Sequence, residues 1–550
     1  MSGGQERGID LTWAWALLGV MASSVVLWWP SGDAPWIVWL LEGPPVVLLA
    51  MLAGVSTTMA VGPRLASGDV GGALRATIMR GLLVAMLGLV LGAVAYSVWG
   101  VLAPIGIAIA VGAVALVLPT WAVAVLAALL AINGGWMLAL ARQSAPVLEQ
   151  AHSITTLMMD PYGTAADIVA AGLHPALTLL TAVLVGVIVA RVLERGARAG
   201  RRRATLGAIA GGGALLATIG IAVGEIALLV VGGAFAPGDP ALAREWLLAS
   251  GRYQPLPSGL EYQLLSAPLS GTPVEVVRML GLALLAIGTI GLLADLAPGR
   301  LRPWLEPARA LGAAMLTMYA VHAIAYTALG QLGADGPPWA TGWDGMLLHL
   351  AICLIALSLL AARGVMDPIG AGIDHVAERV AGGRRPLRPA FGFPDDTSLT
   401  YEVQLHAPIE RVWQAITDPE LVRRWSEHPS RPILRSEGDV RTGGTWRWQV
   451  GTAVGAPIEV FGEYLQIEAP TTLVQTMRTA TGGLQMTSID RLFQFDGVTT
   501  LRTRNVYPSE RARARGLAGL RINRDAWTRL AALVEQPDAM RPPADARPRP

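Results

Sequence analysis

Apolar runs of bilayer length recur along the first 365 residues. A transmembrane helix needs about 20 predominantly apolar residues to cross a bilayer. Segments of about that length lie at 11–29, 36–62, 81–98, 100–118, 121–140, 174–192, 205–235, 275–296, 310–331 and 346–362. The pattern therefore predicts an all-α polytopic membrane bundle of about ten spans, with the lipid bilayer as its first partner.

The pattern changes after residue 365. Residues 367–385 have amphipathic helical spacing, and the Pro-rich residues that follow predict a linker. From residue 398 apolar side chains alternate at period two, as in SLTYEVQL, which predicts a half-buried strand. A helix, five more strand-like runs and a closing helix over 509–536 follow. The predicted regions are a membrane domain over 1–365, a juxtamembrane helix and linker over 366–397, an α+β domain over 398–536 and a disordered tail over 537–550.

Composition supports a membrane protein and narrows its partners. Apolar residues make up 53% of the 550 residues and charged residues 15%, which is more apolar length than one soluble core uses. The net charge of +2 gives no general reason to bind nucleic acid. The single cysteine, Cys353, excludes an intramolecular disulfide framework and a thiolate metal site. No other set of residues has the spacing of a metal site.

The basic residues are all arginine, and they collect in alternate connections between the predicted spans. Arg7, the groups within 64–80, 191–203 and 300–309, and everything after Arg363 fall on one side of a ten-span count. Because cytosolic loops carry the excess of positive charge, both termini are predicted to be cytosolic. The 191–203 cluster also fits attraction of coenzyme A or anionic lipid, although setting the topology is the simpler explanation.

Ionisable residues inside the predicted spans are the best candidates for function. Such a residue costs roughly 2.5–3.5 kcal/mol at the bilayer centre on insertion scales, so it faces the bundle interior and often marks a site. The candidates are Asp10, Glu42, Glu225 and His322, and Tyr319 shares a helix face with His322. A neutral imidazole can act as a base or an acyl acceptor, or it can hydrogen-bond a neighbouring helix. The sequence leaves both roles open for His322.

The apolar stretches RGIDLTWAWALLGVMASS, HPALTLLTAVLVGVIVARV and LGAAMLTMYAVHAIA occur in this order along the chain. In this they resemble a bacterial multi-span family related to heparan-alpha-glucosaminide N-acetyltransferase. The resemblance implies acyl transfer from acetyl-CoA or another acyl-CoA, with His322, Glu225 and Asp10 as candidate catalytic residues. The chain departs from that family at Ser23 and Ser24, where relatives have His or Asn, and at Leu269, where they have His.

The region 398–536 carries a second resemblance. The stretches APIERVWQAITDPELVRRW, GDVRTGGTWRWQV and GEYLQIEAPTTLVQTM are similar to the START/polyketide-cyclase-like superfamily (SRPBCC), in the branch related to the activator of the heat-shock chaperone ATPase. The resemblance implies a helix-grip fold, in which a curved sheet wraps a long helix and a hydrophobic ligand is held between them. The aromatic candidates for lining that space are Trp413, Trp446, Trp448, Phe461 and Trp527, although core packing explains them as well.

Three classes of function fit these patterns. The chain is read as an acyltransferase-like membrane protein whose cytosolic domain binds a hydrophobic small molecule. The alternatives are a transporter or flippase lined by the same polar residues and a sensor in which the ligand-bound domain biases the membrane bundle. The sequence has no Gly-rich phosphate loop that chooses among them, and it does not predict the oligomeric state.

Overall fold

The structure is a computed structural model that divides into two compact units, Arg7–Gly383 and Arg384–Pro550 with Met1–Glu6. It describes residues 3–536 except 27–39, 67, 96–99, 145–151, 200, 233–237, 240, 246–255, 257–258, 332–341, 364–366, 383–389, 393–396, 428–431, 453–455, 481–484, 496–497, 510, 514 and 517–525. The first unit, called the helical region below, is built from helices. The second, called the C-terminal domain, is built around one antiparallel sheet. The predicted tail over 537–550 lies outside the described residues.

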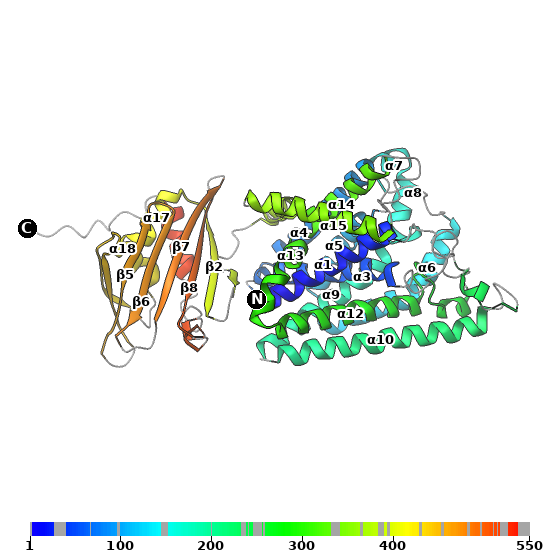
Figure 1. The fold of residues 1–550 in the computed structure, drawn as a ribbon, viewed down its shortest axis with the longest axis horizontal. Helices are drawn as coiled ribbons and strands as arrows, with labels where there is room; N and C mark the ends of the chain where they lie inside the picture. Colours follow the sequence, from blue (N-terminus) through cyan, green and yellow to red (C-terminus); the bar gives the residue numbers. More distant parts are fainter. Residues whose placement is uncertain are drawn as a thin grey trace, which may run out of the picture. The chain divides into compact units, whose positions relative to one another are not determined.

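The helical region contains long helices joined by short ones (Figure 1). The long helices are α1 (Gly3–Val26), α3 (Pro44–Ala66), α4 (Val70–Val94), α6 (Thr120–Ser144), α9 (Ala176–Arg198), α10 (Arg202–Val231), α12 (Pro273–Leu296) and α15 (Gly342–Ala362). The shorter ones are α5 (Leu102–Gly112), η1 (Ala113–Leu116), α7 (Ile154–Met159), α8 (Pro161–Ala166), η2 (Asp167–Ala171), η4 (Leu260–Leu264), η5 (Gly299–Leu301), α13 (Arg302–Ala313), α14 (Met315–Gly330) and α16 (Pro368–Ala381).

Eight helices among the described residues are long and apolar enough to cross a membrane, and a bent pair would make a ninth. The predicted membrane-type bundle is therefore confirmed, with fewer full spans than ten. The predicted span 310–331 is broken into α13 and α14, which meet at 77°. This break has a physical reason, because α13 carries Arg302, Glu306 and Arg309 whereas α14 is apolar.

The predicted span 100–118 is an apolar helix too short to be a full span. The 11 residues of α5 rise about 17 Å, little more than half of a hydrocarbon core of about 30 Å, before the backbone tightens into η1. Arg191 of α9 makes this early end possible. Its guanidinium donates hydrogen bonds to the carbonyl oxygens of Ala115, Leu116 and Leu118 at 2.8 to 3.0 Å, which satisfies the carbonyl groups left at the helix end.

Small residues bring the central helices close together. Gly54 of α3 and Gly186 of α9 face each other, and a Cβ on either would collide with a backbone carbonyl of the other helix, at Val183 or Met51. Close backbone approach at glycine is the usual way in which membrane helices gain packing contacts. The apolar core of the helical region surrounds this crossing.

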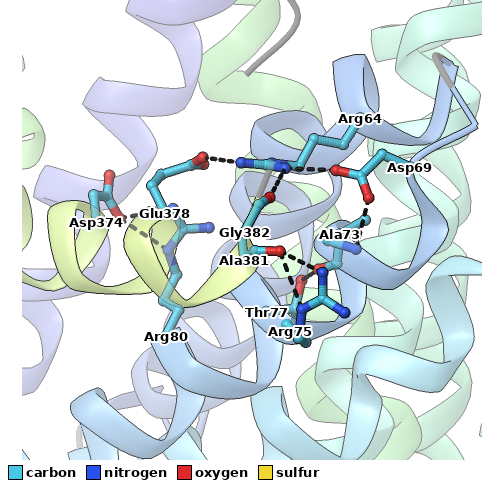
Figure 2. Close-up of polar contacts among 11 residues, drawn as sticks. Arg64, Asp69, Ala73, Arg75, Thr77, Arg80, Asp374, Glu378, Ala381 and Gly382 are labelled. Carbon is cyan, nitrogen blue, oxygen red and sulfur yellow. Dashed lines mark hydrogen bonds and ion pairs between the residues drawn. The ribbon is translucent and has the colours of Figure 1, made fainter. Parts of the chain in front are cut away.

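The helix α16 packs against α4 and is attached to it by charged groups (Figure 2). Arg64, at the end of α3, is buried and lies at the centre of the group. Its guanidinium contacts Asp69 at 2.6 Å and Glu378 of α16 at 2.7 Å. Arg75 donates to the carbonyl oxygen of Ala381 at the last residue of α16. The amphipathic helix expected within 367–385 is thus fixed to the helical region.

The first turn of α16 is held by a different helix. Asp367 caps α16 by accepting from the backbone N–H of Gly370, and its carboxylate also contacts the hydroxyl of Thr317 in α14. The backbone N–H of Ile369 donates to the same hydroxyl at 3.3 Å. Polar groups at both ends of α16 therefore connect it to α3, α4 and α14.

The C-terminal domain contains one eight-stranded antiparallel sheet with the order β1-β2-β8-β7-β6-β5-β4-β3. The strands are β1 (Ala390–Gly392), β2 (Ser398–Leu405), β3 (Ile433–Gly438), β4 (Thr445–Val450), β5 (Ile458–Glu468), β6 (Thr472–Thr479), β7 (Gln485–Phe495) and β8 (Val498–Val506). The helices α17 (Ile409–Thr417), α18 (Pro419–Ser426) and α20 (Ala526–Glu535) lie on one face of the sheet, called the inner face (Figure 1).

The core of this domain lies between the inner face and α20. Leu399, Tyr401, Val403 and Leu405 of β2 are all buried, as the period-two pattern predicts. Trp527, Leu530, Ala531 and Val534 of α20 pack against this row and against Leu492 and Leu501. The helix-grip architecture predicted from the sequence is confirmed. Of the closing helix expected over 509–536, residues 517–525 lie outside the described residues.

Candidate functional sites

A buried carboxylate at the start of α12 is the most elaborate polar centre of the helical region. Thr272 is the N-cap of α12, and its hydroxyl accepts from the backbone N–H of Glu275 at 3.2 Å. The carboxylate of Glu275 accepts hydrogen bonds from the backbone N–H groups of Leu269 at 2.6 Å and Gly271 at 2.7 Å, and from the Ser270 hydroxyl at 3.0 Å. Three donors thus hold a charge that is removed from solvent.

Leu269 is held in an unusual conformation by the same centre. Its φ of 61° lies in the left-handed region, which residues other than glycine rarely adopt and which clusters at functional sites. Its N–H binds Glu275, and its carbonyl oxygen accepts from Arg142 of α6 at 3.0 Å. Leu269 stands where the resembled family has a histidine, and here its backbone takes part in the polar centre instead of its side chain.

Two arginines complete this centre. Arg142 also donates to the carbonyl oxygens of Ala171 and Gly172, at 2.9 and 2.7 Å. Arg278, one turn after Glu275 on α12, is fully buried and lies 3.8 Å from its carboxylate. We call Glu275, Arg142 and Arg278 the α12 charge cluster. Buried charges inside a membrane bundle are costly and often mark a functional site, and the apolar pattern of the sequence did not indicate this set.

His322 lies in the interior of the helical region, as predicted, and its partner is a second histidine. Its Nδ1 lies 3.3 Å from Nδ1 of His349 in α15, and the ring centroids are 4.9 Å apart. Tyr326 of α14 lies against both rings. Both histidines are at most 1% exposed, and neither Nε2 has a hydrogen-bond partner in the structure. We call His322 and His349 the histidine pair.

The other two candidate catalytic residues have different partners, so the three predicted residues do not form one site. Asp10 pairs with Arg309 of α13, 3.2 Å away. Glu225 of α10 pairs with Arg244, and its side chain is 39% exposed. The expectation that Glu225 faces the bundle interior is therefore wrong, because an arginine outside the span neutralises it at an accessible position. Glu42 is buried, next to Gly43, where a Cβ would lie 4.0 Å from the Glu275 carboxylate.

Most described arginines of the 191–203 cluster already have protein partners. Arg191 binds the end of η1, and Arg195 donates to the Thr120 hydroxyl at 3.1 Å. Arg202 pairs with the Asp295 carboxylate at 2.7 Å, and Arg203 reaches the Asp295 carbonyl oxygen at 3.4 Å. These contacts join the ends of neighbouring helices, which favours a structural role for these four arginines over binding of coenzyme A phosphates.

Polar side chains cross the inner face of the sheet in the C-terminal domain. Residues paired across adjacent strands point to the same face. Tyr401, Thr503 and Asp490 are paired across β2, β8 and β7, and Asn505 and Ser488 form the next pair on the same face. We call these five residues the polar row. They are all buried, under a sheet that is otherwise packed with apolar side chains.

The polar row is connected by hydrogen bonds but is not saturated. The Asp490 carboxylate contacts the hydroxyls of Thr503 and of Ser488, the latter at 3.3 Å. Burial raises the pKa of Asp490 to about 6, although these hydrogen bonds oppose the shift. Asn505 hydrogen-bonds Tyr401 and Tyr507, while its Oδ1 has no partner in the structure. A buried acceptor without a donor is rare in folded proteins and calls for a water or ligand.

Four of the five predicted aromatic residues lie on the inner side of the sheet. The rings of Trp446 and Trp448 on β4 are 4.8 Å apart and belong to an apolar cluster separate from the main core. Trp413 of α17 packs against both clusters, and Trp527 of α20 lies 4.8 Å from Tyr401. The indole Nε1 of Trp446 is buried and has no hydrogen-bond partner in the structure.

Phe461, the fifth predicted aromatic residue, lies on the other face. It is paired with Arg447 of β4 and Arg478 of β6, and it is 38% exposed. The inner positions of β5 are Val460 and Tyr464, which belong to the cluster around Trp446. The expectation that Phe461 lines the space under the sheet is therefore wrong, because the strand's period of two places it outside.

Comparison with known proteins supports the assignment of the C-terminal domain. Residues 406–535 match the model of the family "Activator of Hsp90 ATPase homolog 1-like protein". The chain carries a helix-grip domain of this type. Similar solved structures include proteins from Rhodobacter sphaeroides (21% identity, 27% of this chain and 98% of that chain, TM-score 0.25), Nitrosomonas europaea (20%, 26% and 96%, 0.23) and Mycobacterium smegmatis (21%, 26% and 91%, 0.24).

No curated protein matches the chain. The long apolar helices of the helical region suggest insertion in a membrane, whereas its resemblance to N-acetyltransferases remains a prediction.

Proposed function

We propose that the helical region transfers an acyl group from an acyl thioester such as acetyl-CoA, and that the histidine pair carries the group. The observation that carries this proposal is the pair itself, two buried imidazoles joined through Nδ1 with no partner on either Nε2. If His322 only connected two helices, any small polar side chain could be its partner. A second histidine in that place adds the free-energy cost of burying another imidazole. Nucleophile and base within hydrogen-bonding reach are the arrangement that covalent catalysis requires.

The tautomers of the pair define the chemical step. The contact between the two Nδ1 atoms is a hydrogen bond only when one ring carries its proton on Nδ1 and the other on Nε2. The first ring then has a lone pair on Nε2, which attacks the thioester carbonyl. A nitrogen–carbon bond forms, the carbon–sulfur bond breaks and the thiolate leaves with the electron pair. The Nδ1 proton of the acylated ring passes to Nδ1 of the second ring.

Labelled donor tests the proposal directly. The detergent-solubilised protein is incubated with radiolabelled acetyl-CoA, and the label on the protein is measured with and without hydroxylamine. We expect wild type to carry label that hydroxylamine releases. We expect His322→Asn and His349→Asn to carry none, because an amide supplies no nucleophilic or basic nitrogen. His375→Asn, at an exposed position of α16, is the matched control and keeps the label. Equal labelling of His322→Asn and wild type would contradict the proposal.

A second function, binding of a hydrophobic small molecule by the C-terminal domain, is favoured by the inner face of its sheet. Apolar ligand sites combine apolar lining with a few polar groups that fix orientation. The cluster around Trp446 supplies the lining, and the polar row supplies acceptors and donors. The free Oδ1 of Asn505 and Nε1 of Trp446 correspond to a ligand that carries both a hydrogen-bond donor and an acceptor.

Extraction of the purified full-length protein tests ligand binding. An apolar molecule extracted in a fixed ratio to protein is expected from wild type. Trp448→Ala, on the inner face, should reduce that ratio by removing lining surface. Phe461→Ala, on the outer face of the neighbouring strand, is the matched control and should leave it unchanged. Equal loss in both variants, or no extractable molecule from wild type, would contradict a site on the inner face.

We also propose that both termini are cytosolic, from the distribution of arginine between alternate connections. Sealed, inside-out and right-side-out vesicles carrying tags at residues 1 and 550 test this orientation. Protease should remove both tags only in inside-out vesicles.

A further inference from the structure

A buried histidine and aspartate form a second pair in the segment between α6 and α9. His152 precedes α7, where Ser153 caps the helix through Thr156. Asp167 begins η2, and its carboxylate contacts Nε2 of His152. Both side chains are more than nine-tenths buried. An aspartate that accepts from Nε2–H fixes both the ring's orientation and its tautomer, which leaves the lone pair on Nδ1.

The Nδ1 of His152 is buried and has no hydrogen-bond partner in the structure. Two further polar atoms of the helical region share this property. Thr164 Oγ1 belongs to α8, directly before η2, and Gln263 Oε1 faces Gly135 on α6, the helix that carries Arg142. Buried polar atoms are almost always satisfied by protein, water or ligand. The unpartnered Nδ1 of His152 therefore indicates that a water or a ligand binds beside the His–Asp pair.

The backbone of His152 and the ring of Tyr326 contact the end of α4 within one turn of each other. The backbone carbonyl of His152 lies against Gly92, so closely that a Cβ there would collide with it. One turn further, Ala95 packs against Ala323 and Tyr326 of α14. Tyr326 lies against the rings of the histidine pair. The end of α4 thus contacts the backbone of His152 and, through Ala95, the Tyr326 ring that lies against the histidine pair.

The α12 charge cluster fixes the position of Asp167. Arg142 donates to the carbonyl oxygens of Ala171 and Gly172, and the backbone N–H of Gly172 donates to the carbonyl oxygen of Asp167 at 2.9 Å. The same guanidinium binds Leu269. A rigid backbone therefore holds the carboxylate that orients His152.

We propose that His152 is the general base for the second half of the acyl transfer, and that the acceptor carries an amino or hydroxyl group. The inference rests on the proposed acyl transfer by the histidine pair. The acceptor nitrogen or oxygen attacks the acyl carbon, and its proton passes to Nδ1 of His152. The bond between acyl carbon and imidazole nitrogen breaks, and its electron pair returns to the ring while the second ring of the histidine pair gives the Nδ1 proton back, which restores two neutral imidazoles. Asp167 is a positioning residue that stabilises the imidazolium formed at His152.

The test separates loading of the acyl group from its release. Full-length protein in detergent is loaded with radiolabelled acetyl-CoA, the free donor is removed, and loss of label is followed in buffer, in ethanolamine and in hydroxylamine. Ethanolamine supplies both acceptor groups, and water is the acceptor in buffer. General base catalysis contributes about 10²-fold or more, so His152→Gln should slow loss in buffer and in ethanolamine by about that factor.

Loading and release by hydroxylamine should be unchanged in His152→Gln, because hydroxylamine is already unprotonated at neutral pH and needs no base. Asp167→Asn should give a smaller slowing with the same unchanged loading, a pattern that general damage to the fold would not produce. His406→Gln, at an exposed site, is the control. Label loss from His152→Gln at the wild-type rate would overturn this inference alone. Failure of wild type to load would overturn the proposed function and this inference with it.

Discussion

The two regions of the molecule bury polar groups in different ways. In the helical region several buried groups bind distant parts of the chain, as when Arg142 of α6 binds carbonyl oxygens before α9 and α12. In the C-terminal domain the polar row consists of neighbours across adjacent strands. A helix satisfies its own backbone and presents each side chain to whichever helix packs beside it. A sheet aligns its side chains by register.

This difference has a consequence for function. Sites in the helical region depend on how several helices pack, so removal of one partner leaves a buried charge or imidazole exposed to an apolar interior. The polar row depends on one sheet, so its groups keep their arrangement when one of them changes. Substitutions should therefore act over longer distances in the helical region than in the C-terminal domain.

The largest expected effect comes from separating the regions. The fragment 398–536 contains the inner-face core and the helices that cover it, so we expect one cooperative thermal transition from the fragment alone. Circular dichroism of the purified fragment measures this. A fragment that melts without a cooperative transition would mean that the sheet needs the helical region to fold. The polar row would then not depend on one sheet alone.

Titration of Asp490 is expected to change the free energy of unfolding by about 3 kcal/mol. Its pKa is raised from 3.8 to about 6 in the folded domain, so folding favours the protonated form. The stability that this group contributes is complete below about pH 4 and is lost as the pH rises through about 6. A shift of about two pKa units corresponds to about 3 kcal/mol.

Asp490→Asn removes that dependence. We expect the variant fragment to be more stable than wild type at pH 8 and not more stable at pH 4, with a flatter pH profile between the two, as measured by urea unfolding. A parallel pair of profiles would show that Asp490 is not the group that titrates. Ser436→Ala, elsewhere in the sheet, provides the control.

A smaller loss of stability is expected where α16 attaches to the helical region. Arg64→Met removes the cation shared by Asp69 and Glu378. Breaking a buried pair costs about 3 to 5 kcal/mol, and we expect about 2 kcal/mol here because both carboxylates are partly exposed. Hydrogen exchange in residues 368–381 should become faster.

Arg80→Met is the matched control for this prediction. Its ion pair with Asp374 is mostly exposed on the carboxylate side, and exposed pairs contribute at most about 1 kcal/mol. If both variants accelerate exchange equally, burial of Arg64 does not determine how α16 is attached.

Most of the fold could be predicted from the sequence because two of its patterns are strong, the alternation of apolar residues in strands and the length of the apolar runs. The alternation in SLTYEVQL located β2 and its buried face, and apolar length located the long helices. The break at Ala314 and the early end of α5 were missed, because they depend on the charges of α13 and on Arg191 binding a helix end from another segment. Apolar length alone carries no information about such partners.

The candidate sites were less predictable, for the same reason. His322 was selected because a single imidazole in an apolar run is conspicuous, yet its partner His349 lies 27 residues away on another helix. Glu275 had a local signal, the pattern of Thr272 with a glutamate three residues later, which is a common capping motif. The polar row also had a local signal in the sequence, because Ser488 and Asp490 occupy alternate positions of a strand where buried apolar residues are expected.

The division of labour between the regions can be tested by native mass spectrometry of the solubilised full-length protein and of the fragment 398–536, each before and after addition of acetyl-CoA. The account predicts that the full-length protein gains the mass of one acetyl group, that His322→Asn does not, and that the fragment gains none. An acetyl group on the fragment, or none on the full-length protein, would contradict the claim that the histidine pair carries the acyl group.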